Sequence, residues 1–76
     1  MARGALGDTE GEIADYDRAI QIDPEYVDAY YNRGIARTAI GDQPGATADF
    51  LAAASRYQQQ GKERDYQDAL EQLKKL

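Results

Sequence analysis

The sequence predicts an all-α protein in which antiparallel helix-turn-helix repeats stack into an α solenoid, with a single helix capping the C-terminal end. Two observations lead to this fold class. The chain repeats itself at an offset of 34 residues: nine of 22 pairs are identical when residues 1–22 are laid over residues 35–56, where chance gives about one or two. Between glycines and prolines, apolar residues recur at steps of three and four, as on one face of a helix.

The first predicted helix covers residues 9–22. Its apolar stripe consists of Ile13, Tyr16, Ala19 and Ile20. Asp8 is the expected N-cap, since a carboxylate at that position accepts a free backbone N–H. Residues 1–6 align with residues 35–40, so we expect them to form the last turn and a half of a helix, with the chain beginning within a repeat.

The second predicted helix covers about residues 24–40. Asp23 is its expected cap, and Pro24 suits the first turn, where the missing N–H is not needed. Gly41 marks the end, because glycine accepts the left-handed conformation that follows many helices. Gly34 lies in the middle of the helix at a cost of about 1 kcal/mol relative to alanine, so we expect another backbone to pass close to it.

The third and fourth helices are predicted over about residues 43–59 and 62–76. Pro44 opens the third helix, whose apolar face alternates alanines with aromatic rings such as that of Phe50. The fourth helix has an amphipathic stripe that starts at Tyr66, and two lysines lie near its end, where cations meet the negative pole of the helix dipole.

The recurring residues follow a known pattern. They are Gly7-Asp8, Ala14, Tyr16, Ala19-Ile20, Ile22-Asp23-Pro24, Ala29-Tyr30-Tyr31-Asn32-Arg33-Gly34, Gly41-Asp42, Ala46, Phe50 and Ala53. In these residues the chain resembles the tetratricopeptide repeat family, over residues 1 to about 57. The resemblance implies helix pairs stacked into a right-handed superhelix. Within one domain, residues 1–23 would be the second helix of a partial repeat, residues 24–59 one full repeat, and residues 60–76 a C-terminal solvating helix.

The resemblance also implies a function, which is protein-protein interaction through a concave groove lined mainly by the first helix of each pair. The matching positions here are Asp28, Tyr31, Asn32, Ile35, Thr38 and Tyr66, with Lys62, Asp65 and Ala69 as weaker candidates. Asn32 is the strongest candidate, since an amide both donates to and accepts from a peptide backbone. The expected partner is a peptide or a protein surface.

The first helix predicts self-association. A repeat buries its face only against neighbours, and about three repeats are normally needed for a stable array. Glu12 takes the place that Ala46 has in the other repeat, and a buried carboxylate without a partner costs several kcal/mol, so we expect this site to be open or paired with a cation. We expect a homodimer or higher oligomer in which stacked or exchanged terminal helices, as in domain swapping, cover Ile13, Tyr16 and Ile20.

Several alternatives stay open at this point. The 76 residues can be an excerpt of a longer repeat array that does not self-associate. The module can also be purely structural and build dimers or open filaments by stacking its repeats. Arg33 and Arg37, four residues apart, either clamp an acidic peptide or pair with neighbouring acids, and we favour the second interpretation.

Composition argues against catalysis. The chain has no cysteine and no histidine, which removes disulfides, the usual zinc sites and every nucleophile-histidine pair. Asp15 and Asp49 occupy equivalent repeat positions, and we attribute them to repetition rather than to paired-acid chemistry. We expect no catalytic residues, no bound metal and no cofactor.

Charge and hydropathy argue against two further classes of partner. The chain has a net charge of -5, whereas proteins that bind nucleic acid or anionic membranes present a positively charged surface. Residues 1–28 carry eight acidic and two basic side chains (-6), and residues 29–76 carry six acidic and seven basic ones (+1). No apolar run approaches the roughly 20 residues that cross a bilayer, so we expect a soluble, cytoplasmic protein without a signal peptide.

Overall fold

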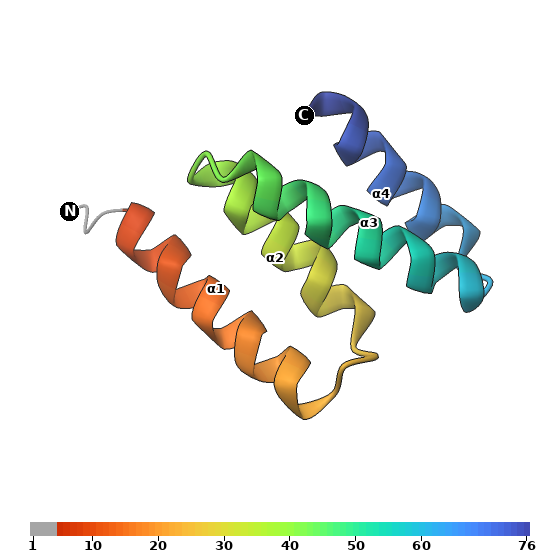
Figure 1. The fold of residues 1–76 in the computed structure, drawn as a ribbon, viewed down its shortest axis with the longest axis horizontal. Helices are drawn as coiled ribbons and strands as arrows, with labels where there is room; N and C mark the ends of the chain where they lie inside the picture. The colour runs from red at the N-terminus through yellow and green to blue at the C-terminus, as the bar shows by residue number, and fades with distance from the viewer. Residues whose placement is uncertain (1–4) are drawn as a thin grey trace.

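The computed structural model describes residues 5–76, and all four helices in this range pack side by side. They are α1 (Ala5–Ile22), α2 (Val27–Ala39), α3 (Gln43–Gln59) and α4 (Glu63–Lys75). Each runs antiparallel to the next, with α1 at one edge of the array, α4 at the other, and α2 and α3 between them (Figure 1). The array measures 41 × 29 × 19 Å. The predicted all-α fold of antiparallel helix pairs is therefore confirmed.

The turns after α2 and α3 share one geometry, which the glycines make possible. Gly41 has φ of 82° and Gly61 has φ of 73°, in the left-handed region that glycine enters without steric strain. The Asp42 N–H reaches back to the Arg37 carbonyl at 2.8 Å, and the Lys62 N–H reaches the Tyr57 carbonyl at 2.9 Å. These bonds, each between residues five apart, satisfy carbonyls at the helix ends. Both helices therefore end where the glycines predict.

The start of α3 also follows its sequence. The Asp42 carboxylate accepts the Gly45 N–H at 3.0 Å, and Pro44 lies in the first turn. An acid in this position satisfies one of the free N–H groups at the helix start. The predicted bounds of this helix, residues 43–59, are those observed.

Two predicted helix starts are wrong. α1 runs without a break through Gly7 and Asp8, so Asp8 lies within the helix and does not cap it. Glycine permits the left-handed turn that Gly41 makes but does not impose it, and its equivalent Gly7 is helical. The expected helix end over residues 1–6 falls mostly on residues 1–4, which lie outside the described range.

The second wrong start is that of α2, which begins at Val27, three residues after Pro24. The Asp23 carboxylate accepts the Glu25 N–H at 3.1 Å, and the Asp23 carbonyl accepts the Tyr26 N–H at 2.9 Å. Short acidic side chains often bond their own backbone in this way and so compete with helix formation. Asp23 therefore stabilises a turn between the helices rather than the start of α2.

The core lies between α2, α3 and α4. Its buried apolar residues are Val27, Ala29, Ala36, Ala46, Phe50, Ala53, Ala54, Tyr57 and Ala69. Phe50 is fully enclosed, and its ring lies directly over Gly34, where an added Cβ would be 2.8 Å from Cε1. We expected a backbone close to Gly34, and the neighbour is instead this aromatic ring. Because the ring occupies the space of a side chain, glycine is required there in spite of its low helix propensity.

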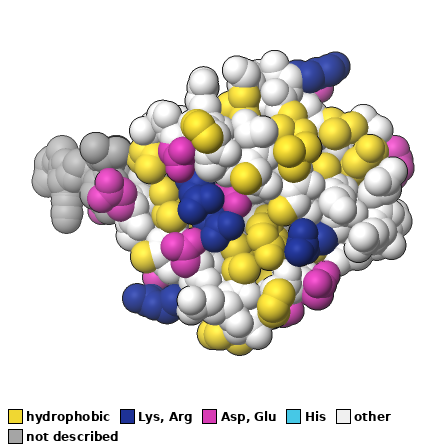
Figure 2. All heavy atoms as spheres, in the orientation of Figure 1, with side chains coloured by type: hydrophobic (Ala, Val, Ile, Leu, Met, Phe, Trp, Pro, Cys, Tyr) yellow, Lys and Arg dark blue, Asp and Glu magenta, His cyan; other side chains and the backbone are white. Residues whose placement is uncertain are grey.

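The surface of the array carries mixed charges. On the face shown in Figure 2, basic and acidic side chains lie close together among apolar ones, and neither sign forms a continuous patch there. Within residues 5–76, none of the helices combines the length and the apolar character that crossing a membrane requires.

Candidate interaction surfaces

One face of α2 holds three of the predicted groove residues, Asp28, Asn32 and Ile35. Their spacing of four and three places them in a row along the helix. Asn32 is exposed, and its side chain makes no hydrogen bond to any described residue. Ile35 is 41% exposed and is one of the large apolar side chains that the described part of the chain presents to solvent. We call this row of three the α2 strip.

Tyr31, beside the strip, ties α2 to the other two helices of the core. Its ring meets that of Phe50 edge-on with centroids 5.6 Å apart, and that of Tyr57 at 6.5 Å. Its hydroxyl oxygen accepts a long hydrogen bond from Gln72 Nε2 of α4 at 3.4 Å. Tyr31 is only partly buried, so part of the residue remains accessible at the surface. Such a held aromatic side chain loses little freedom on binding.

Asp28 anchors the strip at the start of α2. The Tyr57 hydroxyl donates to its carboxylate at 2.7 Å, from the buried face of α3. Burial, and then this hydrogen bond to Asp28, raise the pKa of the Tyr57 phenol well above its ordinary value. The phenol therefore stays neutral and holds one oxygen of Asp28 in place.

The other predicted groove residues are less available. The Thr38 hydroxyl donates to the Gly34 carbonyl of its own helix at 2.9 Å, although the residue is exposed. Tyr66 is half-buried against the core cluster, and Ala69 is fully buried. The structure thus brings Asp28, Asn32 and Ile35 together in the open, whereas internal contacts engage Thr38, Tyr66 and Ala69.

A shallow hollow lies at the Asp28 end of the α2 strip. It is lined by Asp23, Glu25, Tyr26, Val27, Asp28, Gln60 and Lys62. Three carboxylates and one ammonium group line it, so its net charge is negative. The hollow joins the turn before α2 to the turn before α4, and Asp28 and Lys62 both line it.

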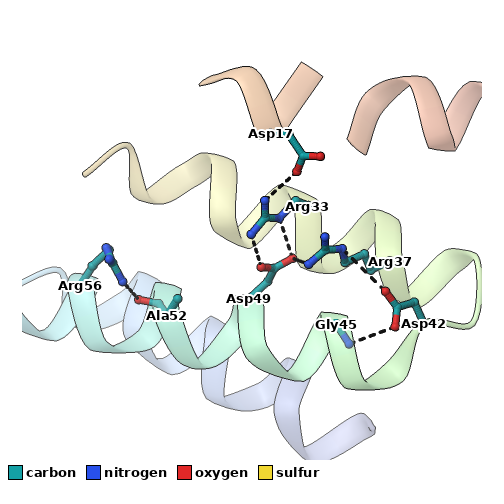
Figure 3. A network of polar contacts seen from close by, with 8 residues as sticks. All are labelled: Asp17, Arg33, Arg37, Asp42, Gly45, Asp49, Ala52 and Arg56. Atoms are coloured by element: carbon teal, nitrogen blue, oxygen red, sulfur yellow. Dashed lines mark hydrogen bonds and ion pairs between the residues drawn. The ribbon is translucent and has the colours of Figure 1, made fainter. Parts of the chain in front are cut away.

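A second polar cluster, shown in Figure 3, joins α1, α2 and α3 through Arg33. Arg33 donates to both oxygens of Asp49, at 2.9 and 2.7 Å, and to Asp17 of α1 at 2.7 Å. Arg37 adds a further bond to Asp49 at 3.1 Å and lies 3.8 Å from Asp42. The Asp49 side chain is only 3% exposed and that of Arg33 16%. Both arginines are therefore committed to acids of this chain, and the clamp interpretation is wrong.

The ion cluster fixes the charge of its central cation. The hydrogen bonds that Arg33 donates to Asp49, followed by the one that it donates to Asp17, raise the pKa of the Arg33 guanidinium, against the opposing effect of burial. Arg33 is therefore a permanent positive charge that three helices share. The favoured prediction that Arg33 and Arg37 pair with neighbouring acids is confirmed. The acids themselves were not identified, although the repeat of Asp15 and Arg3 as Asp49 and Arg37 was a signal that the acid and the base belong together.

α1 differs from the helices of the core, since none of the side chains described in it is fully buried. Ile13, Tyr16 and Ile20, the residues expected to mediate self-association, are half-buried. Ile13 and Ile20 share a row with Asp17, which bonds Arg33, so this row faces α2. Glu12 is exposed, in keeping with the expectation of an open site.

Acidic side chains do not converge on a metal site in the described part of the chain. Residues 5–76 contain no group of three or more acidic side chains with the arrangement that holds a metal ion. Asp15 and Asp49, the equivalent pair, have separate partners, because Asp15 bonds Arg18 at 3.2 Å on the surface of α1. The repeated carboxylates thus stabilise the helices in different ways and do not share a site.

Comparison with known proteins identifies a repeat within the chain. Residues 5–41, which cover α1, α2 and the following turn, match the TPR repeat family. The chain is 38% identical over 48 residues to Protein FlbA of Caulobacter vibrioides, and 43% identical over 44 residues to Serine/threonine-protein phosphatase T of Aspergillus oryzae. It is 42% identical over 45 residues to FK506-binding protein-like of Mus musculus.

These alignments cover 63%, 58% and 59% of this chain, but only 8%, 9% and 13% of the three relatives. The similarity therefore lies in the repeat motif, and the chain spans only a small part of each relative's length. No solved structure matches the chain. The 34-residue period, the antiparallel helix pairs and the family match agree that residues 5–41 form a tetratricopeptide repeat.

Proposed function

We propose that this chain is a protein-protein interaction module that binds an extended segment of another protein along the α2 strip. TPR repeats generally mediate such interactions, and the observation that supports this location is the pairing of Asn32 with Ile35. A free amide and an exposed apolar side chain lie one turn apart on a rigid helix. The amide can bond a peptide backbone, and Ile35 can bury an apolar side chain of the ligand.

The surroundings of the strip indicate which peptide it prefers. Asp28, held by Tyr57, and the acidic hollow beside it lie at one end of the strip. A basic side chain or an N-terminal amine of the ligand fits that end, with an apolar residue over Ile35 further along α2. Tyr31 supplies a rigid ring edge between them, and aromatic residues of this kind are enriched among the residues that dominate binding energy.

A displayed library of random peptides tests this function. Selected peptides are measured against the wild-type chain and against Asn32→Ala, Tyr31→Ala and Ile35→Ala. Leu51→Ala is the matched control, since Leu51 is a similarly exposed apolar side chain, 55% accessible, on α3. We expect the Asn32 and Ile35 variants to weaken binding at least fivefold and Leu51→Ala to leave it within twofold. Unchanged binding in the α2 variants would remove the strip from consideration.

Self-assembly is the second candidate function, and the half-buried state of Ile13, Tyr16 and Ile20 favours it. Such a chain forms a homodimer, or stacks into filaments, when another copy covers α1 by stacking or by exchange of a terminal helix. Light scattering over a concentration series tests this candidate. A mass that rises with concentration supports it, and a cooperatively folding monomer at micromolar concentration contradicts it.

A further inference from the structure

We infer that the guanidinium of Arg56 on α3 is a carboxylate-binding site, which takes an acidic side chain of a protein partner. The site is a hollow of about 280 Å³ lined by Glu25, Ser55, Arg56 and Gln59, and we call it the Arg56 hollow. It lies between the turn before α2 and the last turns of α3, and it shares no residue with the α2 strip. All four of its lining residues lie within the described chain.

Arg56 carries a buried donor that no residue of the described chain satisfies. Its Nε–H group is buried and has no hydrogen-bond partner. Its Nη1 group donates to the Ala52 carbonyl at 3.2 Å, which is the one hydrogen bond that this side chain makes within the described residues. The Glu25 carboxylate is paired with it only loosely, since Oε1 lies 3.9 Å from Nε, beyond hydrogen-bond range. Buried polar groups are normally hydrogen-bonded, so this side of the guanidinium calls for an acceptor.

Arg33 shows what the same edge of a guanidinium does when an acid reaches it. Its Nε and Nη2 groups bind the two oxygens of Asp49 side-on, at 2.9 and 2.7 Å. Among the residues drawn in Figure 3, Arg56 reaches only the Ala52 carbonyl, through Nη1. Its Nε–Nη2 edge is therefore available to an incoming group. A carboxylate matches that edge in spacing and in charge, because its two oxygens accept two parallel N–H bonds.

The Arg56 guanidinium is held in place before a ligand arrives. It stacks on the Tyr30 ring of α2, with Cζ 4.5 Å from the ring centroid. A planar guanidinium that stacks on an aromatic ring is pre-organised, so it loses little freedom when it forms its hydrogen bonds. The Arg56 side chain is 27% exposed and lines the hollow, so a ligand reaches it from that side.

Glu25 is the internal competitor for this edge. Its side chain is 70% exposed, and an exposed ion pair at 3.9 Å contributes little. The Glu25 N–H donates to the Asp23 carboxylate at 3.1 Å, which ties the backbone of Glu25 to the turn and leaves its side chain free to rotate. The Glu25 carboxylate can therefore turn toward solvent and give way to an acid that brings further contacts with it.

The surroundings of the hollow indicate that the acid belongs to a polypeptide. Small-molecule sites bury most of the ligand surface, which one guanidinium in an open surface hollow does not achieve. Leu51, one turn before Ser55 on α3, is 55% exposed and offers apolar area to the residues that flank the acid. The Ser55 hydroxyl and the Gln59 amide line the hollow and can bond the backbone of the same segment.

The internal repeat places this feature in one copy only. At the 34-residue offset, Arg56 corresponds to Ile22, which is apolar and 84% exposed. Ser55 corresponds to Gln21, and Gln59 corresponds to Glu25. The residues of the hollow are therefore not part of the pattern that the two repeats share, and the stacking of the helices does not require them.

NMR of the arginine Nε–Hε groups tests the site directly. The folded chain is titrated with sodium acetate at constant ionic strength, and acetamide serves as the uncharged analogue of the same shape. We expect acetate to move the Arg56 Hε signal downfield and to saturate, and acetamide to leave it unchanged. The signals of Arg18 and Arg64, which are exposed, serve as internal controls and should respond weakly without saturation.

Two matched charge variants test the role of Glu25. Glu25→Gln removes the competitor, so it should tighten acetate binding about threefold, whereas Glu10→Gln removes the same charge from an exposed position on α1 and should change it little. Arg56→Gln should abolish the acetate-induced amide shifts of Ser55 and Gln59. Arg56→Lys keeps the positive charge but lacks the two-donor edge, so it should lose most of the response while folding like the wild type, which circular dichroism checks.

A displayed peptide library with one fixed central glutamate tests whether the acid comes from a protein. Selection uses the Ile35→Ala variant, so that the α2 strip does not contribute. We expect replacement of the peptide's glutamate by glutamine to weaken binding about tenfold on this variant and not on Ile35→Ala combined with Arg56→Gln, because the lost interaction is shared. Amide shifts should map the selected peptides to Leu51, Ser55 and Gln59.

Four results would overturn the inference. The first is an Arg56 Hε signal that is already downfield in the free chain and moves back in Glu25→Gln, since Glu25 would then fill the edge. The second is an equal response of Arg18 and Arg56 to acetate, and the third is a full response in Arg56→Lys. The fourth is acetate binding at Arg56 with no glutamate-dependent peptide, which would mean that the acid is a free small molecule. None of these results depends on Asn32 or Ile35, so this site and the α2 strip fail separately.

Discussion

The replacement of Asp49 by asparagine is the most informative test of how the helices are held together. Asp49 is 3% exposed and takes three hydrogen bonds from Arg33 and Arg37. Asparagine has nearly the same shape, so the variant leaves no cavity, but it removes the charge and turns an NH₂ group toward two cations. Removing one partner of a buried ion pair typically costs about 3–5 kcal/mol.

We expect the lower end of that range, about 3 kcal/mol, for Asp49→Asn. Arg33 keeps Asp17 at 2.7 Å, and Arg37 keeps Asp42 at 3.8 Å, so neither arginine is left alone. A chain of 76 residues has a free energy of unfolding of roughly 4–11 kcal/mol, at about 0.05–0.15 kcal/mol per residue. The variant would lose a large share of this free energy of unfolding. With a urea m-value of about 1–1.5 kcal/mol/M, the urea concentration at the unfolding midpoint would fall by about 2–3 M.

Asp15→Asn is the matched control, because Asp15 is the repeat equivalent of Asp49 and is 74% exposed. Its surface pair with Arg18 contributes little, so the loss should stay below about 0.5 kcal/mol. Urea unfolding followed by circular dichroism measures both variants under the same conditions. If Asp49→Asn costs less than about 1 kcal/mol, or if the two variants cost the same, the assignment of Asp49 as the buried centre of the ion cluster is wrong.

The remaining predictions concern packing and pH. Gly34→Ala should lower the free energy of unfolding by about 1–3 kcal/mol, because the added Cβ would meet the Phe50 ring. Gly11 has open space around it, so Gly11→Ala should raise the free energy of unfolding by about 0.5–1 kcal/mol. Chemical unfolding measures both variants, and equal effects would contradict the close contact at Gly34. The raised pKa of Tyr57 means that the fold favours the neutral phenol. The stabilisation by Tyr57 is therefore complete below pH 10, the ordinary pKa of a phenol, and is lost as the pH rises above that value. Tyr57→Phe should therefore lower stability by about 1 kcal/mol at pH 8, and the gap to the wild type should narrow above pH 10; a gap that does not change with pH would refute the role of the bond to Asp28.

Much of the fold could be predicted from the sequence, because its signals are local. The 34-residue period, the glycines after α2 and α3, and Pro44 gave the number of helices and the bounds of α3. The start of α2 was misplaced because Asp23 can serve either a helix or a turn, and the choice depends on backbone geometry that no single residue reveals. The contact at Gly34 was recognised as close, but whether a ring or a backbone made it depends on how α3 packs.

The candidate site was less predictable than the fold. Asp15 and Asp49 look alike in the sequence, and only the packing of α2 over α3 makes one a buried centre and the other a surface acid. The partner of Arg33 on α1, Asp17, is 16 residues away, and no repeat position links the two. Thr38 and Tyr66 were expected in the groove on pattern alone, and the structure shows how far internal contacts already engage them.

The most direct test of the proposed binding function maps a library-selected peptide onto the chain by backbone and side-chain amide NMR. We expect the largest shift changes on the α2 strip, including the Asn32 side-chain amide, and we expect Asn32→Ala and Ile35→Ala to reduce the affinity while Leu51→Ala does not. Shift changes confined to the outer surface of α3, an affinity that the α2 variants leave intact, or a library from which no peptide binds above background would contradict it.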